Sequence, residues 1–75
     1  MKRQYKDDIL LKKAIGKLKA LREAKGISLE TVYNDIDVNI GRIESLKSNI
    51  SLSTLARLCK YYKISLSEFF KSISQ

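Results

Sequence analysis

The sequence predicts an all-α fold, with about five short helices packed into a single compact domain. Pro is absent from the 75 residues and Gly occurs only three times, whereas an all-β domain of this size needs many turns, which these two residues usually form. A chain this short folds around one shared core. The apolar residues, which make up 44% of the chain, recur at steps of three and four, as they do on one face of a helix.

The first helix is predicted from about Asp7 to Lys25. Asp7 and Asp8 lie where acidic side chains stabilise a helix N-terminus, and Lys25 followed by Gly26 is typical of a helix end. One face of this helix carries the apolar side chains Leu11, Ala14, Ile15, Leu18 and Leu21.

Two shorter helices follow, and each begins at a polar residue that can cap it. Ser28 is the predicted N-cap of the second helix, and Asp37 is that of the third, which extends from about Val38 to Leu46. The apolar positions of these two helices are Leu29, Val32, Ile36, Ile40 and Ile43.

The last third of the chain predicts two more helices. Ser51 begins the fourth, and Ser65 with Glu68 forms a capping box for the fifth. The apolar residues of the two helices are Leu52, Leu55, Ala56, Cys59 and Tyr62, then Leu66, Phe69, Phe70 and Ile73. We therefore expect one domain over residues 1–75, with a core from about 7 to 73 and a flexible basic tail over residues 1–6.

The net charge of +7 favours a polyanionic partner, because Lys and Arg that neutralise phosphates release condensed counterions. Residues 1–25 carry nine bases and three acids (+6), residues 28–46 one base and four acids (−3), and residues 47–75 five bases and one acid (+4). An acidic middle therefore lies between two basic segments.

Few residues of the kinds that bind metals or catalyse reactions are present. The chain has no His and one Cys, which excludes the usual zinc and haem arrangements and an internal disulfide. It has no glycine-rich phosphate loop, and no nucleophile stands near a plausible base. We expect no enzyme activity, no metal, no cofactor and no small-molecule ligand, and we place Cys59 in the core.

No apolar run is long enough to cross a membrane, and the N-terminus does not continue into the apolar core of a signal peptide. These two observations predict a cytoplasmic protein without a membrane partner.

Two segments, and the distance between them, resemble the Cro and CI repressor-like (Xre-type) helix-turn-helix family. They are LREAKGIS, at residues 21–28, and RIESLKSNISLSTLARLCKYYKISLSEFF, at residues 42–70. The resemblance covers about Ile15 to Phe70 and implies a lambda-repressor-like helix-turn-helix domain that binds double-stranded DNA. In this family the second and third helices form the reading unit, and the third helix lies in the major groove.

The resemblance also implies which residues contact DNA. Arg42 and Asn39 face base edges, where Arg matches the acceptors of guanine and Asn pairs with adenine or with a phosphate. Asp37 and Val38 face the groove beside them, and Asp37 can accept a hydrogen bond from a cytosine amino group. The family's phosphate-contacting positions are occupied here by Ser28, Lys47, Ser48 and Asn49.

Arg22 and Glu44 match an arginine and a glutamate that pair in relatives. A bidentate ion pair between them would be structural, because it ties the first helix to the reading helix.

The chain departs from the family pattern in length, at two positions and in the acidic charge of residues 28–46. About three residues are missing between Val32 and Ile43, so the reading unit is shortened. Leu29 stands where the family commonly has glutamine, and Leu46 stands where a glycine often ends the third helix.

Four aromatic side chains near the C-terminus exceed what so small a core needs. Some of them form a symmetric dimer interface, or all of them pack in the core, and the sequence leaves both open. They are Tyr61, Tyr62, Phe69 and Phe70.

The first functional hypothesis is a sequence-specific transcriptional regulator, a repressor or controller that binds DNA as a homodimer. The second is a helix-turn-helix scaffold used mainly to bind a protein, as an antitoxin or accessory factor does. The acidic middle of the chain is the observation in favour of the second.

Overall fold

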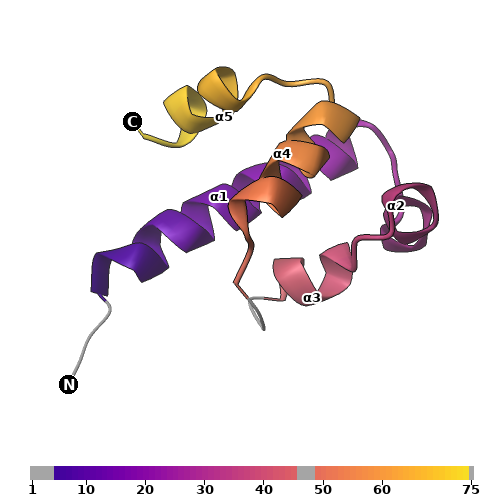
Figure 1. Ribbon diagram of the computed structural model, residues 1–75, viewed down its shortest axis with the longest axis horizontal. Coiled ribbons are helices and arrows are strands. Elements are labelled where there is room, and N and C mark those ends of the chain that lie inside the picture. The colour runs from indigo at the N-terminus through magenta and orange to yellow at the C-terminus, as the bar shows by residue number, and fades with distance from the viewer. Residues whose placement is uncertain (1–4, 46–48, 75) are drawn as a thin grey trace.

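In the computed structural model, which describes residues 5–45 and 49–74, the chain folds into five helices and, in those ranges, no strand (Figure 1). The all-α prediction is confirmed. The helices are α1 (Tyr5–Ala24), α2 (Leu29–Ile36), α3 (Ile40–Glu44), α4 (Leu52–Tyr61) and α5 (Leu66–Ile73).

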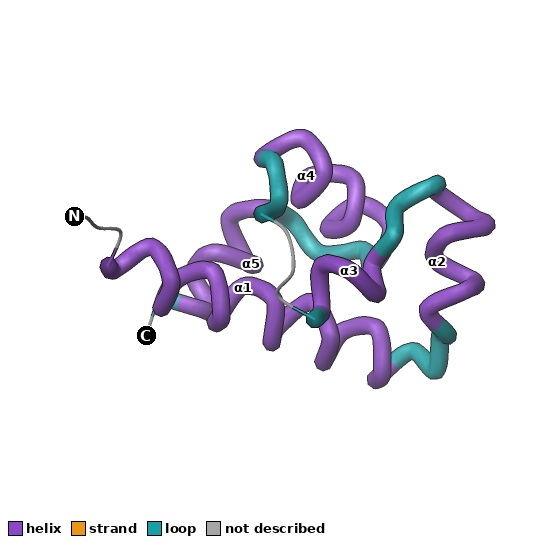
Figure 2. Tube along the Cα trace, turned by 90° about the horizontal axis from the view of Figure 1, so that it is seen from below, coloured by secondary structure: helices purple, strands orange, loops and turns teal. Residues whose placement is uncertain are grey.

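The long helix α1 is the axis on which the shorter helices are arranged. α2 lies at its C-terminal end, and α5 packs against α1 toward the opposite end of the molecule (Figures 1 and 2). α3 packs against both α1 and α2. This arrangement holds the shortest helix beside the end of the longest one.

One core joins all five helices, because each contributes at least one side chain that is buried. Full burial of such an apolar side chain contributes about 1.5–3 kcal/mol. The side chains with no exposed surface are Leu18, Val32, Ile40, Leu58 and Phe69. Cys59 is buried among them, as predicted.

α1 ends in a Schellman motif at Gly26, whose φ is +66°. The Ile27 amide donates to the Arg22 carbonyl at 3.2 Å, and the Gly26 amide donates to the Glu23 carbonyl at 3.0 Å. Both bonds satisfy carbonyls that a helix end leaves unpaired, and the left-handed conformation that they require suits glycine. The predicted end of the first helix at Lys25 and Gly26 is therefore correct to one residue.

Three helices begin with the same short segment. Ser28, Ser51 and Ser65 are the N-caps of α2, α4 and α5, as predicted, with ψ of 163°, 159° and 155°. Each hydroxyl accepts from the backbone amide three residues later at 3.0–3.1 Å. Each serine stands between an isoleucine, which packs partly buried against the core, and a leucine.

The start of α3 differs from the prediction. The N-cap is Asn39, not Asp37, and the helix covers five residues from Ile40. Asp37 instead ends α2 in a left-handed conformation with φ of 59°, and its amide donates to the Tyr33 carbonyl at 2.9 Å. The turn between α2 and α3 is short, and Val38 packs in the core, where it is 6% exposed. Helix α3 therefore begins at Ile40, two residues after the predicted start at Val38.

Two further expectations are corrected at helix starts. Leu52 was expected on the apolar face of the fourth helix, but it is 68% exposed, because the first residue of a capped helix projects beyond the packed face. α1 begins at Tyr5, so Tyr5 and Lys6 belong to a helix and not to the predicted tail.

Candidate nucleic-acid interface

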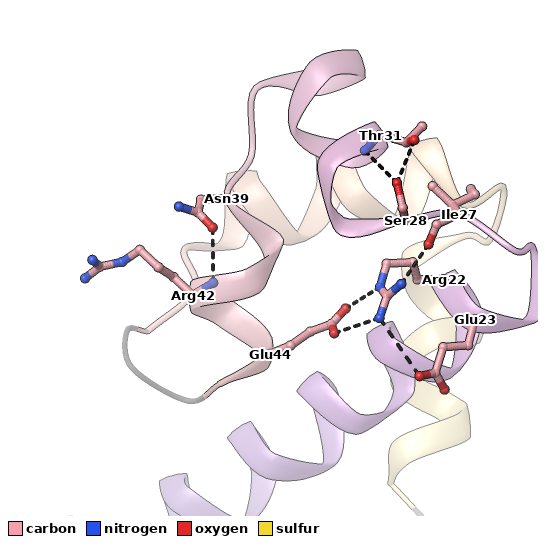
Figure 3. A network of polar contacts seen from close by, with 8 residues as sticks. All are labelled: Arg22, Glu23, Ile27, Ser28, Thr31, Asn39, Arg42 and Glu44. Atoms are coloured by element: carbon pink, nitrogen blue, oxygen red, sulfur yellow. Dashed lines mark hydrogen bonds and ion pairs between the residues drawn. The ribbon is translucent and has the colours of Figure 1, made fainter.

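Arg42 combines an exposed side chain with a backbone that is held from both sides. Its amide donates to Asn39 Oδ1 at 3.2 Å, and its carbonyl accepts from the Ser45 hydroxyl at 2.9 Å. The guanidinium points away from α1, on the same side as the Asn39 amide group (Figure 3). α3 therefore presents one cation from a fixed backbone position.

Asn39 has two roles in this geometry. Its Oδ1 caps α3, which leaves the amide nitrogen directed outward beside Arg42 (Figure 3). A carbonyl oxygen has two lone pairs, so the capping bond still allows Oδ1 to accept a second hydrogen bond. The side chain thus keeps the donor and acceptor that pairing with adenine requires.

A shallow hollow of about 280 Å³ gathers several of the predicted residues. It brings Asn49 from beyond α3 next to the start of that helix. Its lining comprises Asp37, Val38, Asn39, Arg42, Ile43, Asn49, Thr54 and Arg57. Val38 lines the hollow with a side chain that is only 6% exposed, so little of that side chain is available to a base.

Arg57 and Thr54 were missed by the sequence analysis. Arg57 donates to the Ile36 carbonyl, and one turn later the Tyr61 hydroxyl donates to Asp35 Oδ2 at 2.5 Å. These two bonds join α4 to the C-terminal end of α2. Their spacing of four residues on α4 was visible in the sequence, but their partners were not.

The Tyr61 hydroxyl has a raised pKa, first because it donates to the Asp35 carboxylate. The bond is made by the neutral phenol, so ionisation of Tyr61 would remove it. The α2–α4 connection is therefore present at neutral pH.

Arg22 joins three parts of the chain. Its Nε donates to Glu44 Oε2 at 2.7 Å and its Nη2 to Glu44 Oε1 at 3.0 Å, while Nη1 donates to the Ile27 carbonyl at 2.7 Å (Figure 3). The pKa of Arg22 is raised, chiefly by the hydrogen bonds to Glu44. The two side chains are only 12% and 9% exposed. The two residues that the resemblance pairs are thus in bidentate contact, which fixes α3 to the C-terminal end of α1.

The acidic middle of the chain is partly neutralised by this contact. The Glu44 carboxylate is bound by Arg22, which lies outside residues 28–46, and the Asp35 carboxylate accepts from Tyr61. Glu30 and Asp37 remain exposed on the outer side. The four acids therefore do not act together on a ligand at α3.

The residues predicted to contact phosphates are spread over two places. Ser28 caps α2 and is exposed, and its hydroxyl lies 2.8 Å from that of Thr31. Asn49 is exposed in the hollow near α3. Lys47 and Ser48 lie outside the described residues.

The aromatic residues of α4 and α5 divide between core and surface. Tyr62 and Phe69 are 1% and 0% exposed, so a place for their side chains in a dimer interface is contradicted, because the core needs both. Phe70 is 39% exposed and packs edge-on against Phe69 with ring centroids 5.6 Å apart. Tyr61 is half-buried.

Within residues 5–45 and 49–74, no helix is long and apolar enough to cross a membrane. In the same part of the chain, no three His, Cys, Asp or Glu side chains form a group able to hold a metal ion.

Comparison with known proteins gives one match. A family model described as helix-turn-helix matches residues 18–69, more than half of the chain. The matched part begins in the second half of α1 and ends in α5. No curated protein and no solved structure matches the chain significantly.

Proposed function

Because the chain belongs to the Cro/CI-type, Xre-like helix-turn-helix family of DNA-binding regulators, we propose that it is a sequence-specific transcriptional regulator. It reads the major groove with the exposed side of α3. The observation that carries the proposal is the position of Arg42: its guanidinium is exposed, while its backbone is held by hydrogen bonds to Asn39 and Ser45. Recognition of a guanine edge requires a planar guanidinium, with its five N–H donors, attached to a backbone that does not move.

The basic flanks supply the affinity that base contacts alone lack. Lys12, Lys13, Lys19 and Lys25 are exposed on α1 and just after it, and they attract a phosphate backbone from a distance. Asn49 contacts a phosphate beside the groove.

The regulator acts as a repressor or controller in the form of a homodimer. Two copies of α3 spaced about one DNA turn apart bind a palindrome far more tightly than one copy does. Exposed Phe70 and Leu66 on α5, at 39% and 37%, support self-association through that helix.

Selection from a pool of random duplexes, followed by fluorescence-anisotropy titration of the recovered sequence, tests the proposal. We expect a two-fold motif from the wild-type protein. Arg42→Ala should weaken binding to it by about 1–3 kcal/mol and relax the preference at one position in each half-site. Arg42→Lys is the matched control, because it keeps the charge and loses the bidentate fork. Binding that stays equally strong and sequence-blind in all three proteins contradicts the proposal.

A second candidate function is binding of a protein partner through the same scaffold. It is supported by the exposed carboxylates of Glu30 and Asp37, which Arg22 does not neutralise and which oppose the approach of phosphates. A purified partner that binds in a fixed stoichiometry, together with no protected DNA site, would favour this function.

A further inference from the structure

A second hollow, of about 340 Å³, lies between α2 and α3 and is unused by the contacts described so far. It is lined by Leu29, Glu30 and Tyr33 from α2, and by Asn39 and Gly41 from α3. Leu29 is 43% exposed and Tyr33 is 52% exposed. The hollow therefore exposes apolar surface between the two helices of the helix-turn-helix.

Gly41 leaves the middle of this hollow open. A Cβ added there would lie 3.5 Å from Asn39 Oδ1 and 3.8 Å from Leu29 Cδ1, which are ordinary van der Waals distances. An alanine would fit, and glycine within a helix costs about 0.5–1 kcal/mol relative to alanine. The packing of this chain therefore does not require a glycine at this position, and the missing side chain leaves the α3 backbone open to close approach by an outside molecule.

The hollow is continuous with the surface that carries Arg42. Asn39 lines both this hollow and the one beside Arg42. A base pair next to the one read by Arg42 would thus meet Leu29 and Gly41. The Glu30 carboxylate on the rim disfavours a phosphate as the occupant, and the apolar lining favours an uncharged group.

Resting on the proposed function, we propose that this hollow receives the 5-methyl group of a thymine, and that Leu29 is a specificity-determining residue. The thymine methyl is the apolar group that DNA exposes in the major groove, and apolar side chains recognise it by contact. Asn39 beside it is placed to pair with the adenine of the same or the adjacent pair.

Deoxyuridine tests the proposal, because it removes the methyl group of thymine and leaves base pairing intact. Each thymine of the selected duplex is replaced in turn, and the dissociation constant is measured by anisotropy. At one position in each half-site the replacement should weaken wild-type binding about threefold to tenfold, the size expected for one buried methyl group. In Leu29→Ala the same replacement should have no effect.

Leu52→Ala is the matched control. Leu52 also follows an Ile-Ser pair and is also the first residue of its helix, but it lies on α4, outside the hollow, and is 68% exposed. This variant should keep the full discrimination between thymine and deoxyuridine. Circular dichroism melting checks that both variants remain folded, which the exposure of both side chains favours.

Each outcome decides a separate question. A motif that depends on Arg42 but is indifferent to every deoxyuridine overturns the thymine proposal and leaves the proposed function standing. Discrimination that persists in Leu29→Ala overturns the role of Leu29. If Leu29→Ala instead changes self-association and leaves the DNA response unaltered, the hollow binds a second copy, and the proposal is wrong. Recovery of no motif defeats the proposed function, and this inference with it.

Discussion

At the scale of single residues, Arg22 holds the short helix α3 against α1 with one side chain. α3 has five residues, too few to hold a helix by its own hydrogen bonds. Arg22 binds both oxygens of Glu44 and also the Ile27 carbonyl, so it fixes the end of α1, the following turn and α3 together. The family resemblance predicted that Arg22 pairs with Glu44. The charge pattern alone did not distinguish Glu44 from the other acidic residues.

The hydroxyl of Tyr62 is the opposite case, a polar group without a visible partner. It is buried and makes no hydrogen bond to any residue within 5–45 and 49–74. Burial, and then the nearby Glu44 carboxylate, raise the pKa of Tyr62 to about 12. The folded protein thus strongly favours the neutral phenol.

Tyr62→Phe should raise the free energy of unfolding at pH 7 by about 1 kcal/mol, because it removes a buried group that lacks a partner. The pKa is raised on folding from 10 to about 12, so the phenol ionises first in the unfolded chain. The free energy of unfolding of the wild type is therefore unaffected by this group below pH 10 and falls as the pH rises from 10 to 12. The free energy of unfolding of Tyr62→Phe should therefore fall less than that of the wild type between pH 10 and 12.

Urea denaturation at pH 7 and at a series of alkaline pH values measures both effects. Tyr33→Phe is the control, because it removes a hydroxyl from a side chain that is 52% exposed and should change stability by less than about 0.5 kcal/mol. A Tyr62→Phe variant that is less stable than the wild type at pH 7 would show that the hydroxyl is well solvated or bonded.

At the scale of helices, the segment Ile-Ser-Leu is a repeated solution to starting a helix. It occurs before α2, α4 and α5. The serine caps the helix. The isoleucine before it packs partly buried against the core, and the residue at the fourth helical position is buried, which is the spacing of a hydrophobic staple. The staple partners are Val32, Leu55 and Phe69, all buried.

These three helix starts were predictable because every determinant is local. The start of α3 was not, because Asp37 and Asn39 are both good caps and the choice between them depends on the distant core. In the structure Asp37 is the C-cap of α2, and Val38 directly after it is buried. The family resemblance pointed to Arg42 and Asn39 on the candidate site. It did not point to Arg57, whose partner is a backbone carbonyl of another helix.

Two glycines associated with α1 should respond oppositely to alanine. Gly16 lies within the helix with nothing within 4 Å of an added Cβ, so Gly16→Ala should stabilise the protein by about 0.5–1 kcal/mol. Gly26 also has space but adopts φ of +66°, so Gly26→Ala should destabilise it by about 1–2 kcal/mol. Thermal melting of both variants measures this, and equal signs would contradict the assignment of backbone conformation.

At the scale of the whole molecule, exposed apolar side chains lie on α2 as well as on α5: Leu29 and Tyr33 on α2, Phe70 and Leu66 on α5. The two surfaces differ in charge, because the end formed by α2 and α3 also carries the acidic segment and Arg42. The proposed DNA reading and the proposed self-association therefore use different helices. The sequence left open whether the four aromatic side chains form a dimer interface or pack in the core, and of the four only Phe70 is well exposed.

The proposed homodimer should sediment at tens of micromolar with twice the 8.6 kDa mass of the chain. Phe70→Lys should shift the protein to monomer without unfolding it, since Phe70 is 39% exposed. Leu52→Lys is the control, because Leu52 is more exposed and lies on another helix. A wild-type protein that sediments only as monomer, with and without the selected duplex, excludes the dimer.

The shortness of α3 limits how much information one copy can read. At 1.5 Å per residue its five residues span about 7.5 Å, little more than two base-pair steps of about 3.4 Å. A site of two or three base pairs recurs by chance throughout any genome, which offers about 10⁶–10⁹ competing sites. If a regulator reads DNA with this helix, the specificity of its site in the genome depends on the spacing and symmetry of two half-sites more than on the bases within one half-site.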